Sequence, residues 1–230
     1  RTVLDDARVC KPAFLCGVPR LFEKTKQRFE RELADGGVLS GKVNEWLRDI
    51  VVDTSEQEGE EGILHGIKRS IAEKWIWKGM RERMGGRLRF LISGGAPLSV
   101  GVAHFFRAHG IRILEGYGMT ETCAATHVNR YDAWKIGSVG QALNGVEVAF
   151  EDDGELLLRG PNITSGYWNR PRETAAALDS EGWLHTGDLA SIDADGFLTI
   201  TGRKRDVIVS AYGKAIAPSR IASALCSGGL

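Results

Sequence analysis

Four short segments of this 230-residue chain carry residue types that suit a nucleotide pocket. They are residues 93–99 (SGGAPLS), 115–122 (EGYGMTET), 183–188 (WLHTGD) and 202–206 (GRKRD). The adjacent glycines 94 and 95 let the backbone come close to a flat ring. Tyr117 offers an aromatic face to a base, and Glu121 is a hard carboxylate suited to Mg²⁺ held between protein and phosphates.

Three further side chains extend this set. Thr120 can donate to a phosphate oxygen, Asp188 can accept from two ribose hydroxyls, and Arg203 is a fork donor for ribose or phosphate. Each segment alone has a plainer explanation. A Gly-Gly turn is usually only a turn, His185 is more often structural than catalytic, and a basic stretch is usually a solvated face. The prediction of a nucleotide site therefore depends on the four segments together.

The first two segments follow strands of a predicted strand–loop–helix–strand unit. We expect strands at 87–92 and 111–114, with a helix between them that Ser99 caps and Gly110 ends. The second strand is expected to lead into a glycine turn at 116–118. Such a unit implies parallel strands with a right-handed crossover. Ligands of parallel sheets bind at the carboxyl ends of the strands, where both glycine turns are expected.

Other elements are expected on both sides of this unit. Upstream, we expect a strand at 11–17, a helix at 18–33 with Pro19 in its first turn, an exposed acidic loop at 53–62 and an amphipathic helix from 63 to about 85. Trp75 and Trp77 in that helix are interpreted as core residues. Downstream of 136, Asn-Gly and Asp-Gly turns favour a small antiparallel unit. Its predicted elements are strands at 137–139, 146–150, 155–159, 183–189 and 197–201, a helix at 172–178, a charged break at 202–206 and a strand from 207.

Composition excludes some classes of protein. Lys and Arg number 30, as do Asp and Glu, so the net charge of 0 argues against a strongly basic nucleic-acid binder. Hydrophobic residues make up 43% and charged residues 26%, as in ordinary globular proteins. The four cysteines form no CxxC pair, which indicates reduced thiols of an intracellular protein. No apolar run approaches the ~18 residues that span a bilayer.

The order and spacing of the segments resemble the adenylate-forming superfamily, and within it most closely the long-chain fatty acid–CoA ligases. The stretch 11–24 (KPAFLCGVPRLFEK) is similar to the region before the acyl tunnel of that subfamily. The resemblance implies an α/β fold, with parallel βα layers and a small antiparallel β subdomain of the large N-terminal domain. The implied divisions are 1–126 for the βα part, 127–201 for the antiparallel subdomain, 202–206 for a hinge and 207–230 for the start of a C-terminal domain. Phe22 lies where relatives often carry a gate residue for the acyl chain, and plain core packing is the alternative.

The resemblance also implies a role for each site residue. Backbone at 94–96 would line the adenine, Tyr117 would stack on it, and Asp188 with Arg203 would hold the ribose. Thr120 would contact the α-phosphate, and Glu121 would ligate Mg²⁺. The implied nucleotide-binding residues are Gly94, Gly95, Ala96, Glu115, Gly116, Tyr117, Gly118, Thr120, Asp188 and Arg203. The implied catalytic residues are Thr120, Glu121 and Arg205, with Arg205 at the hinge.

The implied reaction has two steps. A fatty acid attacks the α-phosphate of ATP to give acyl-AMP and pyrophosphate, and the CoA thiol then displaces AMP. ATP or AMP and Mg²⁺ are the implied cofactors, with fatty acid and CoA as the other substrates and no nucleic acid. The implied location is cytoplasmic, with peripheral membrane association as the alternative.

The chain departs from the family pattern in ways that bear on catalysis. It contains no Ser/Thr/Gly-rich phosphate loop ending in Pro-Lys-Gly, and it stops before the family's catalytic lysine. Tyr212 stands where relatives carry glycine, and Arg220 stands where they carry an acidic residue. We therefore interpret the chain as a central fragment of a fatty acid–CoA ligase and expect it to be inactive as a ligase by itself. The alternatives are a non-catalytic remnant that binds nucleotide or a partner, and a fragment of a fatty acyl-AMP ligase.

Overall fold

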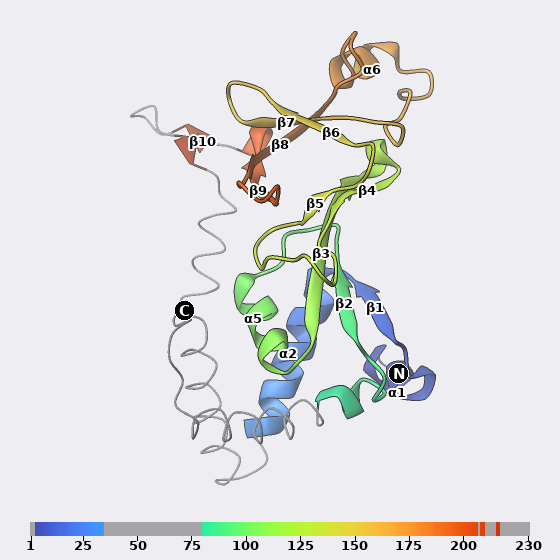
Figure 1. Cartoon of the computed structure of the whole chain (residues 1–230), viewed down its shortest axis with the longest axis vertical. Helices are drawn as coiled ribbons and strands as arrows, with labels where there is room; N and C mark the ends of the chain where they lie inside the picture. The colour runs from blue at the N-terminus through green and yellow to red at the C-terminus, as the bar shows by residue number, and fades with distance from the viewer. Residues whose placement is uncertain (1–2, 35–79, 207, 210–214, 217–230) are drawn as a thin grey trace. The chain divides into compact units, whose positions relative to one another are not determined.

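The computed structural model describes residues 3–34, 80–206, 208–209 and 215–216 (Figure 1). The predicted acidic loop, most of the helix expected from residue 63, both its tryptophans, Tyr212 and Arg220 lie outside the described residues. The chain divides into two compact units, one of residues 1–92 and 101–113, the other of residues 93–100 and 114–230. No helix among the described residues combines the length and apolarity needed to cross a membrane.

The first unit packs helices α2 and α5 side by side (Figure 1). Its elements are α1 (Val3–Cys10), β1 (Phe14–Gly17), α2 (Pro19–Ala34), most of β2 (Phe90–Ser93) and most of α5 (Val100–Ala108). Pro19 is the first residue of α2, as predicted, because a helix's first turn leaves its N–H groups unpaired anyway. Phe22 is 1% exposed and packs edge-to-face on Phe106 with ring centroids 6.2 Å apart. Phe22 is therefore a core residue.

A five-stranded sheet follows the order β1-β2-β3-β4-β5 and contains both parallel and antiparallel pairs, as the α/β prediction requires. Strand β3 (Arg112–Met119) pairs antiparallel with β4 (Ala124–Val128), and β4 pairs antiparallel with β5 (Gln141–Ala142). The parallel pairing therefore lies among β1, β2 and β3.

The glycines 116 and 118 do not form the predicted turn. Strand β3 continues through them, and Tyr117 lies opposite His127 of β4. A Cβ atom on Gly118 would lie 1.9 Å from the carbonyl oxygen of Ala124, at a point where the register shifts. Glycine is needed here because two strands approach closely at a bulge, and the sequence pattern alone did not distinguish that from a turn.

A four-stranded antiparallel sheet in the order β6-β7-β8-β9 makes up much of the rest of the second unit. Its strands are β6 (Glu147–Phe150), β7 (Glu155–Arg159), β8 (Leu184–Ile192) and β9 (Leu198–Arg203). Leu156, Leu158 and Leu198 form its fully buried core. The turn predicted at Asp195-Gly196 joins β8 to β9, where Gly196 has a φ of 81°.

Two predictions in this region are wrong in detail. Residues 137–139 form no strand, because Gly137 and Gly140 take φ values of 81° and 94°, which are turn conformations. The Asn129 side chain holds this turn, since it accepts from Lys135 N and donates to Ser138 O. The charged break begins only at Lys204, because residues 202 and 203 belong to β9.

The remaining elements agree more closely with prediction. Helix α6 (Pro171–Ala177) begins at a proline, and α5 begins one residue after the predicted cap at Ser99. Strand β10 (Ile208–Val209) pairs antiparallel with β11 (Ala215–Ile216).

Candidate nucleotide site

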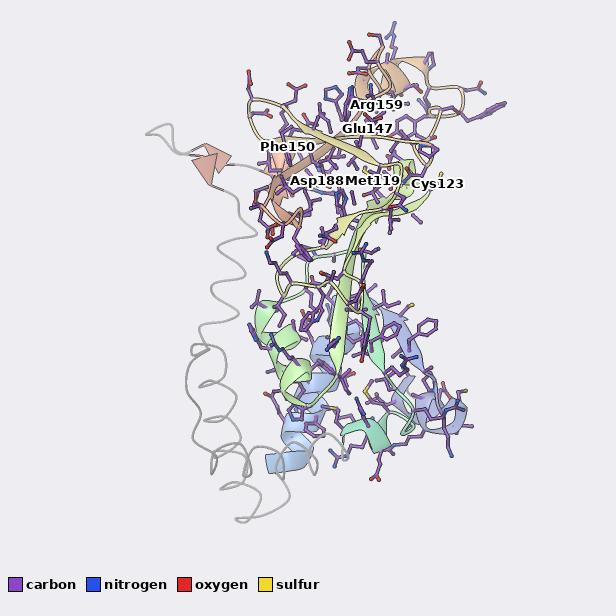
Figure 2. The ribbon with its side chains drawn as sticks, viewed as in Figure 1. Met119, Cys123, Glu147, Phe150, Arg159 and Asp188 are labelled. Atoms are coloured by element: carbon purple, nitrogen blue, oxygen red, sulfur yellow. The ribbon has the colours of Figure 1, made fainter. Side chains whose placement is uncertain are left out.

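Asp188 is the centre of the candidate site. It lies on β8 (Figure 2) and is 4% exposed. Its Oδ2 accepts the Tyr117 hydroxyl (2.7 Å), and its Oδ1 accepts the Arg203 Nε–H (2.8 Å). Asp188 and Arg203 are opposite each other in the β8–β9 register, so the sheet itself makes their ion pair. Three of the four sequence segments thus each contribute one side chain to a single cluster of hydrogen bonds.

The protonation state of Tyr117 suits its role as a donor. Burial raises the pKa of the Tyr117 hydroxyl, and its hydrogen bond to Asp188 raises the pKa further. The phenol therefore stays protonated at neutral pH and donates to the carboxylate. Its ring stays uncharged and available as an aromatic face.

Thr186 fixes the backbone of Asp188 and was missed by the sequence analysis. Its hydroxyl donates to Leu156 O (2.7 Å) and accepts from Asp188 N (3.1 Å). The Thr-x-Asp spacing in HTGD was the available signal, because a threonine two residues before an aspartate can accept the backbone N–H of that aspartate.

Glu155 and Lys204 fix the residues on either side of the cluster, and the sequence analysis missed both. Glu155 accepts from Gly187 N (2.9 Å) and from the Lys204 ammonium (2.9 Å), which also contacts Asp153 (2.6 Å). Burial alone would raise the pKa of Glu155, but the donors Lys204 and Gly187 outweigh burial and the pKa is lowered. Glu155 therefore stays ionised and ties Gly187, next to Asp188, to Lys204, next to Arg203.

The SGGAPLS segment brings its glycines to the backbone of β3. A Cβ atom on Gly94 would lie 3.6 Å from Gly116 O, so the first two segments are neighbours. Gly95 has a φ of 81°, which glycine adopts without strain, and an added Cβ there would meet no atom within 4 Å. Gly95 and Ala96 are exposed, so their backbone groups are accessible to a ligand.

Glu115 is a buried anchor beneath this loop. Glu115 is only 8% exposed, and this burial raises the pKa of its carboxyl to about 7. Hydrogen bonds from the backbone of Leu98 and Gly137 offset part of that rise. Glu115 thus joins β3 to the end of the SGGAPLS segment.

Thr120 and Glu121 lie on a short 3₁₀ turn, Thr120–Thr122, between Met119 and Cys123 (Figure 2). The buried Thr122 ties this turn together, because its hydroxyl accepts from Met119 N (2.9 Å) and contacts Ala124 O (2.7 Å). Thr120 is exposed and Glu121 is half-buried. Glu121 Oε1 accepts the Tyr167 hydroxyl (2.5 Å), a contact that the sequence analysis did not foresee.

The chemistry of Glu121 fits a magnesium ion that a substrate helps to hold. No group of three or more His, Cys, Asp and Glu residues in the described part of the chain could hold a metal alone. Mg²⁺ is usually bound by one or two carboxylates together with substrate phosphates and water. Within the described residues, Glu121 Oε2 makes no hydrogen bond or ion pair, which suits a single-carboxylate ligand.

Arg205 does not join the cluster. It lies on the short turn Lys204–Asp206, is exposed, and pairs with its neighbour Asp206 at 3.8 Å. Among the described residues it makes no hydrogen bond or ion pair with another predicted site residue.

The fold places the chain in the α/β class, and comparison with known proteins identifies its family. The family described as AMP-binding enzyme matches residues 1–168, and the chain belongs to this family. It is 39% identical over 221 residues to the long-chain-fatty-acid–CoA ligase FadD15 of Mycobacterium bovis, covering 95% of this chain and 36% of the relative. It is 35% identical over 233 residues to human long-chain-fatty-acid–CoA ligase 1, covering 96% and 32%.

Solved structures give the same result for the fold. O-succinylbenzoate coenzyme A synthetase from Bacillus subtilis, in complex with ATP and magnesium ion, matches with a TM-score of 0.57 and 30% identity over 72% of this chain and 38% of that chain. The same enzyme with its acyl-adenylate intermediate matches with a TM-score of 0.56 and 34% identity over 61% and 31%. The chain spans roughly a third of the length of the relatives that it matches.

Proposed function

We propose that this chain supplies the nucleoside-binding part of an AMP-forming fatty acid–CoA ligase. The substrates would be a fatty acid and CoA, as the names of the relatives suggest, and ATP, which a related solved structure contains. The observation that carries the proposal is the buried Asp188, which accepts one donor at each oxygen and retains further acceptor capacity at both. A carboxylate of this kind suits two neighbouring hydroxyls of a ribose.

The other residues take their roles from their places around Asp188. Tyr117 would stack on adenine while its hydroxyl holds the carboxylate, and Arg203 would balance the charge of Asp188 on its other side. The accessible backbone at Gly95 and Ala96 would line the adenine. Thr120 would donate to the α-phosphate and Glu121 would ligate Mg²⁺. A bound Mg²⁺ would neutralise charge on the phosphates.

In this proposal the protein supplies no nucleophile. The carboxylate of the fatty acid attacks the α-phosphorus, the bond to pyrophosphate breaks, and the CoA thiol later attacks the acyl carbonyl and releases AMP. The chain's own residues orient the nucleotide and stabilise charge, which are the main contributions a protein makes to an in-line displacement.

Titration of the chain with AMP by calorimetry tests the nucleoside site directly. We expect AMP to bind, GMP to bind more weakly, and Asp188→Asn to lose about tenfold or more in AMP affinity, since hydrogen bonds to charged groups contribute ~1.5–3 kcal/mol each. Asp152→Asn is the matched control, because Asp152 is an exposed aspartate in the β6–β7 turn. Equal AMP affinity in wild type and Asp188→Asn would show that the site has been misassigned.

A chimera tests the ligase reaction itself. In this chimera the present chain would replace the matched segment of the mycobacterial relative FadD15. Pyrophosphate exchange and acyl-CoA formation would then be measured separately. We expect both activities with a fatty acid and loss of both in Asp188→Asn. Pyrophosphate exchange without acyl-CoA would favour the fatty acyl-AMP ligase alternative, and AMP binding without either activity would favour a non-catalytic protein.

A further inference from the structure

We propose that Tyr167 is a positioning residue for Glu121. Its hydroxyl fixes one carboxylate oxygen of Glu121 and leaves the other oxygen directed to a divalent cation that arrives with a nucleotide. The inference rests on the proposed function of Glu121 and adds a role for a part of the chain that the proposed site does not include. That part is residues 162–167 (NITSGY), called the supporting segment below.

The supporting segment contacts the Thr120–Thr122 turn at three points. Asn162 Nδ2 donates to Thr122 O (3.2 Å), Thr164 N donates to Glu121 O (2.8 Å), and the Tyr167 hydroxyl donates to Glu121 Oε1 (2.5 Å). Two of these bonds fix the backbone of the turn, and the third fixes the Glu121 side chain. The segment therefore determines both where the turn lies and how its carboxylate is oriented.

The supporting segment is itself well anchored. Ile163 packs against the three-leucine core of the antiparallel sheet. Tyr167 N donates to Thr174 Oγ1 (2.9 Å), and Thr174 in turn donates to the carbonyl oxygen of Arg170 (2.8 Å), the N-cap residue of α6. Gly166 has a φ of 135°, and a Cβ there would lie 2.5 Å from Thr174 Cγ2, so the close approach to α6 requires glycine.

A neutral hydrogen-bond donor such as Tyr167 suits a metal-ligating carboxylate better than a positively charged partner would. Tyr167 is a neutral donor, so it orients the carboxylate without cancelling the negative charge that a cation needs. Ligating carboxylates and imidazoles are commonly oriented by such outer hydrogen bonds, and loss of one typically weakens metal binding by about 10–100-fold. A lysine or arginine in this place would compete with the cation.

The test measures ATP and AMP binding to the chain by calorimetry, with and without Mg²⁺, and binding of Mn²⁺ in the presence of ATP by water-proton relaxation. In the wild type we expect Mg²⁺ to tighten ATP binding. Tyr167→Phe should lose about tenfold of that tightening and weaken Mn²⁺ binding by a similar factor, because one orienting bond is removed. AMP affinity without metal should be unchanged. Glu121→Gln should lose the whole effect of Mg²⁺.

Second-site variants separate positioning from general destabilisation. Thr174→Val removes the acceptor that holds Tyr167 N and should give a smaller loss of the same Mg²⁺ effect, whereas Thr174→Ser keeps the hydroxyl and should behave as wild type. Tyr131→Phe is the matched control, since it removes the hydroxyl of a tyrosine outside the site. Circular dichroism checks that each variant is folded.

The outcomes are distinguishable. A wild-type chain whose ATP binding ignores Mg²⁺, or a Glu121→Gln variant that keeps the Mg²⁺ effect, contradicts the proposed role of Glu121 and the inference with it. A full Mg²⁺ effect in folded Tyr167→Phe overturns the positioning role alone and leaves the proposed function intact. Loss of metal-free AMP binding in that variant also overturns it, because the role of Tyr167 would then be structural.

Discussion

Asp188 shows how one buried side chain can be fixed by residues far apart in the sequence. Tyr117 comes from β3, Arg203 from β9, and Thr186 holds the backbone of Asp188 from two residues away. A buried carboxylate without such donors would be costly, since an unpaired buried charge is strongly destabilising. The same bonds that would orient a ribose therefore also stabilise the fold.

Tyr117→Phe should distinguish the contribution of the Tyr117 hydroxyl from that of its ring. It keeps the ring and removes the hydroxyl, so the free energy of unfolding should fall by about 1–3 kcal/mol through the lost bond to a charged group. AMP affinity should fall less than in Tyr117→Ala, which also loses a stacking contact of about 1–3 kcal/mol. Urea denaturation and calorimetry measure the two effects. Equal AMP affinity in the Phe and Ala variants would exclude stacking on the ring.

The stability of the chain should depend on the ionisation of Glu115. Burial raises its pKa from 4.5 to about 7, so between these values the folded state binds more protons than the unfolded state. Stability from this group is therefore greatest below pH 4.5 and is lost as the pH rises to 7. Glu115→Gln should flatten this slope, removing up to roughly 3 kcal/mol of pH-dependent stability across the window.

Urea denaturation at several pH values between 4.5 and 7 measures that slope. The control is Glu151→Gln, which changes an exposed glutamate after β6 and should keep the wild-type slope. If Glu115→Gln keeps the slope as well, Glu115 is ionised in the folded chain.

At the scale of elements, the sequence predicted most strands and helices near their places and went wrong where two distant backbones meet. Glycine pairs indicated a turn at 116–118, but the approach of β4 to Gly118 is a long-range contact that no local pattern reveals. Tyr117, Asp188 and Arg203 were recognisable because each lies in a distinctive motif. Tyr167 was not, because its partner Glu121 is 46 residues away in the sequence.

Gly118→Ala should disrupt the pairing of β3 with β4. The new Cβ would lie 1.9 Å from Ala124 O, so the backbone must move, and overpacking of this kind costs typically 1–3 kcal/mol or more. Gly94→Ala is the stability control, because its Cβ would meet its nearest neighbour at 3.6 Å. Thermal unfolding of both variants measures the difference. A Gly118→Ala variant as stable as wild type would mean that the bulge is absent in solution.

At the scale of the whole chain, the proposed nucleoside contacts all belong to one compact unit. Residues 93–100 fall in the second unit together with 114–230, although the strand and helix on either side of 93–100 belong mainly to the first. A ligand that binds only the folded form of one unit stabilises that unit by mass action. Within the strand–loop–helix region that contains it, the SGGAPLS segment is therefore the part that such a ligand would stabilise against opening.

Hydrogen exchange with and without AMP tests this division. Amides of β3, β8 and the SGGAPLS segment should exchange more slowly with AMP bound, whereas amides of α2 in the first unit should change little. At a ligand concentration of 100 Kd the stabilisation is about 2.7 kcal/mol, enough to slow exchange by about a hundredfold where opening is coupled to ligand release. Equal slowing in both units would show that they open together.

The pairing of Asp188 with Arg203 makes the site sensitive to insertions and deletions that touch no ligand. Side chains of a strand alternate between faces, so loss of one residue inside β9, for example Thr201, would turn Arg203 to the opposite face and bring Lys204 opposite Asp188. A length change confined to the 193–197 connection can leave the pairing intact. Homologous chains should therefore vary in length in that connection and keep a constant number of residues from Leu198 to Arg203.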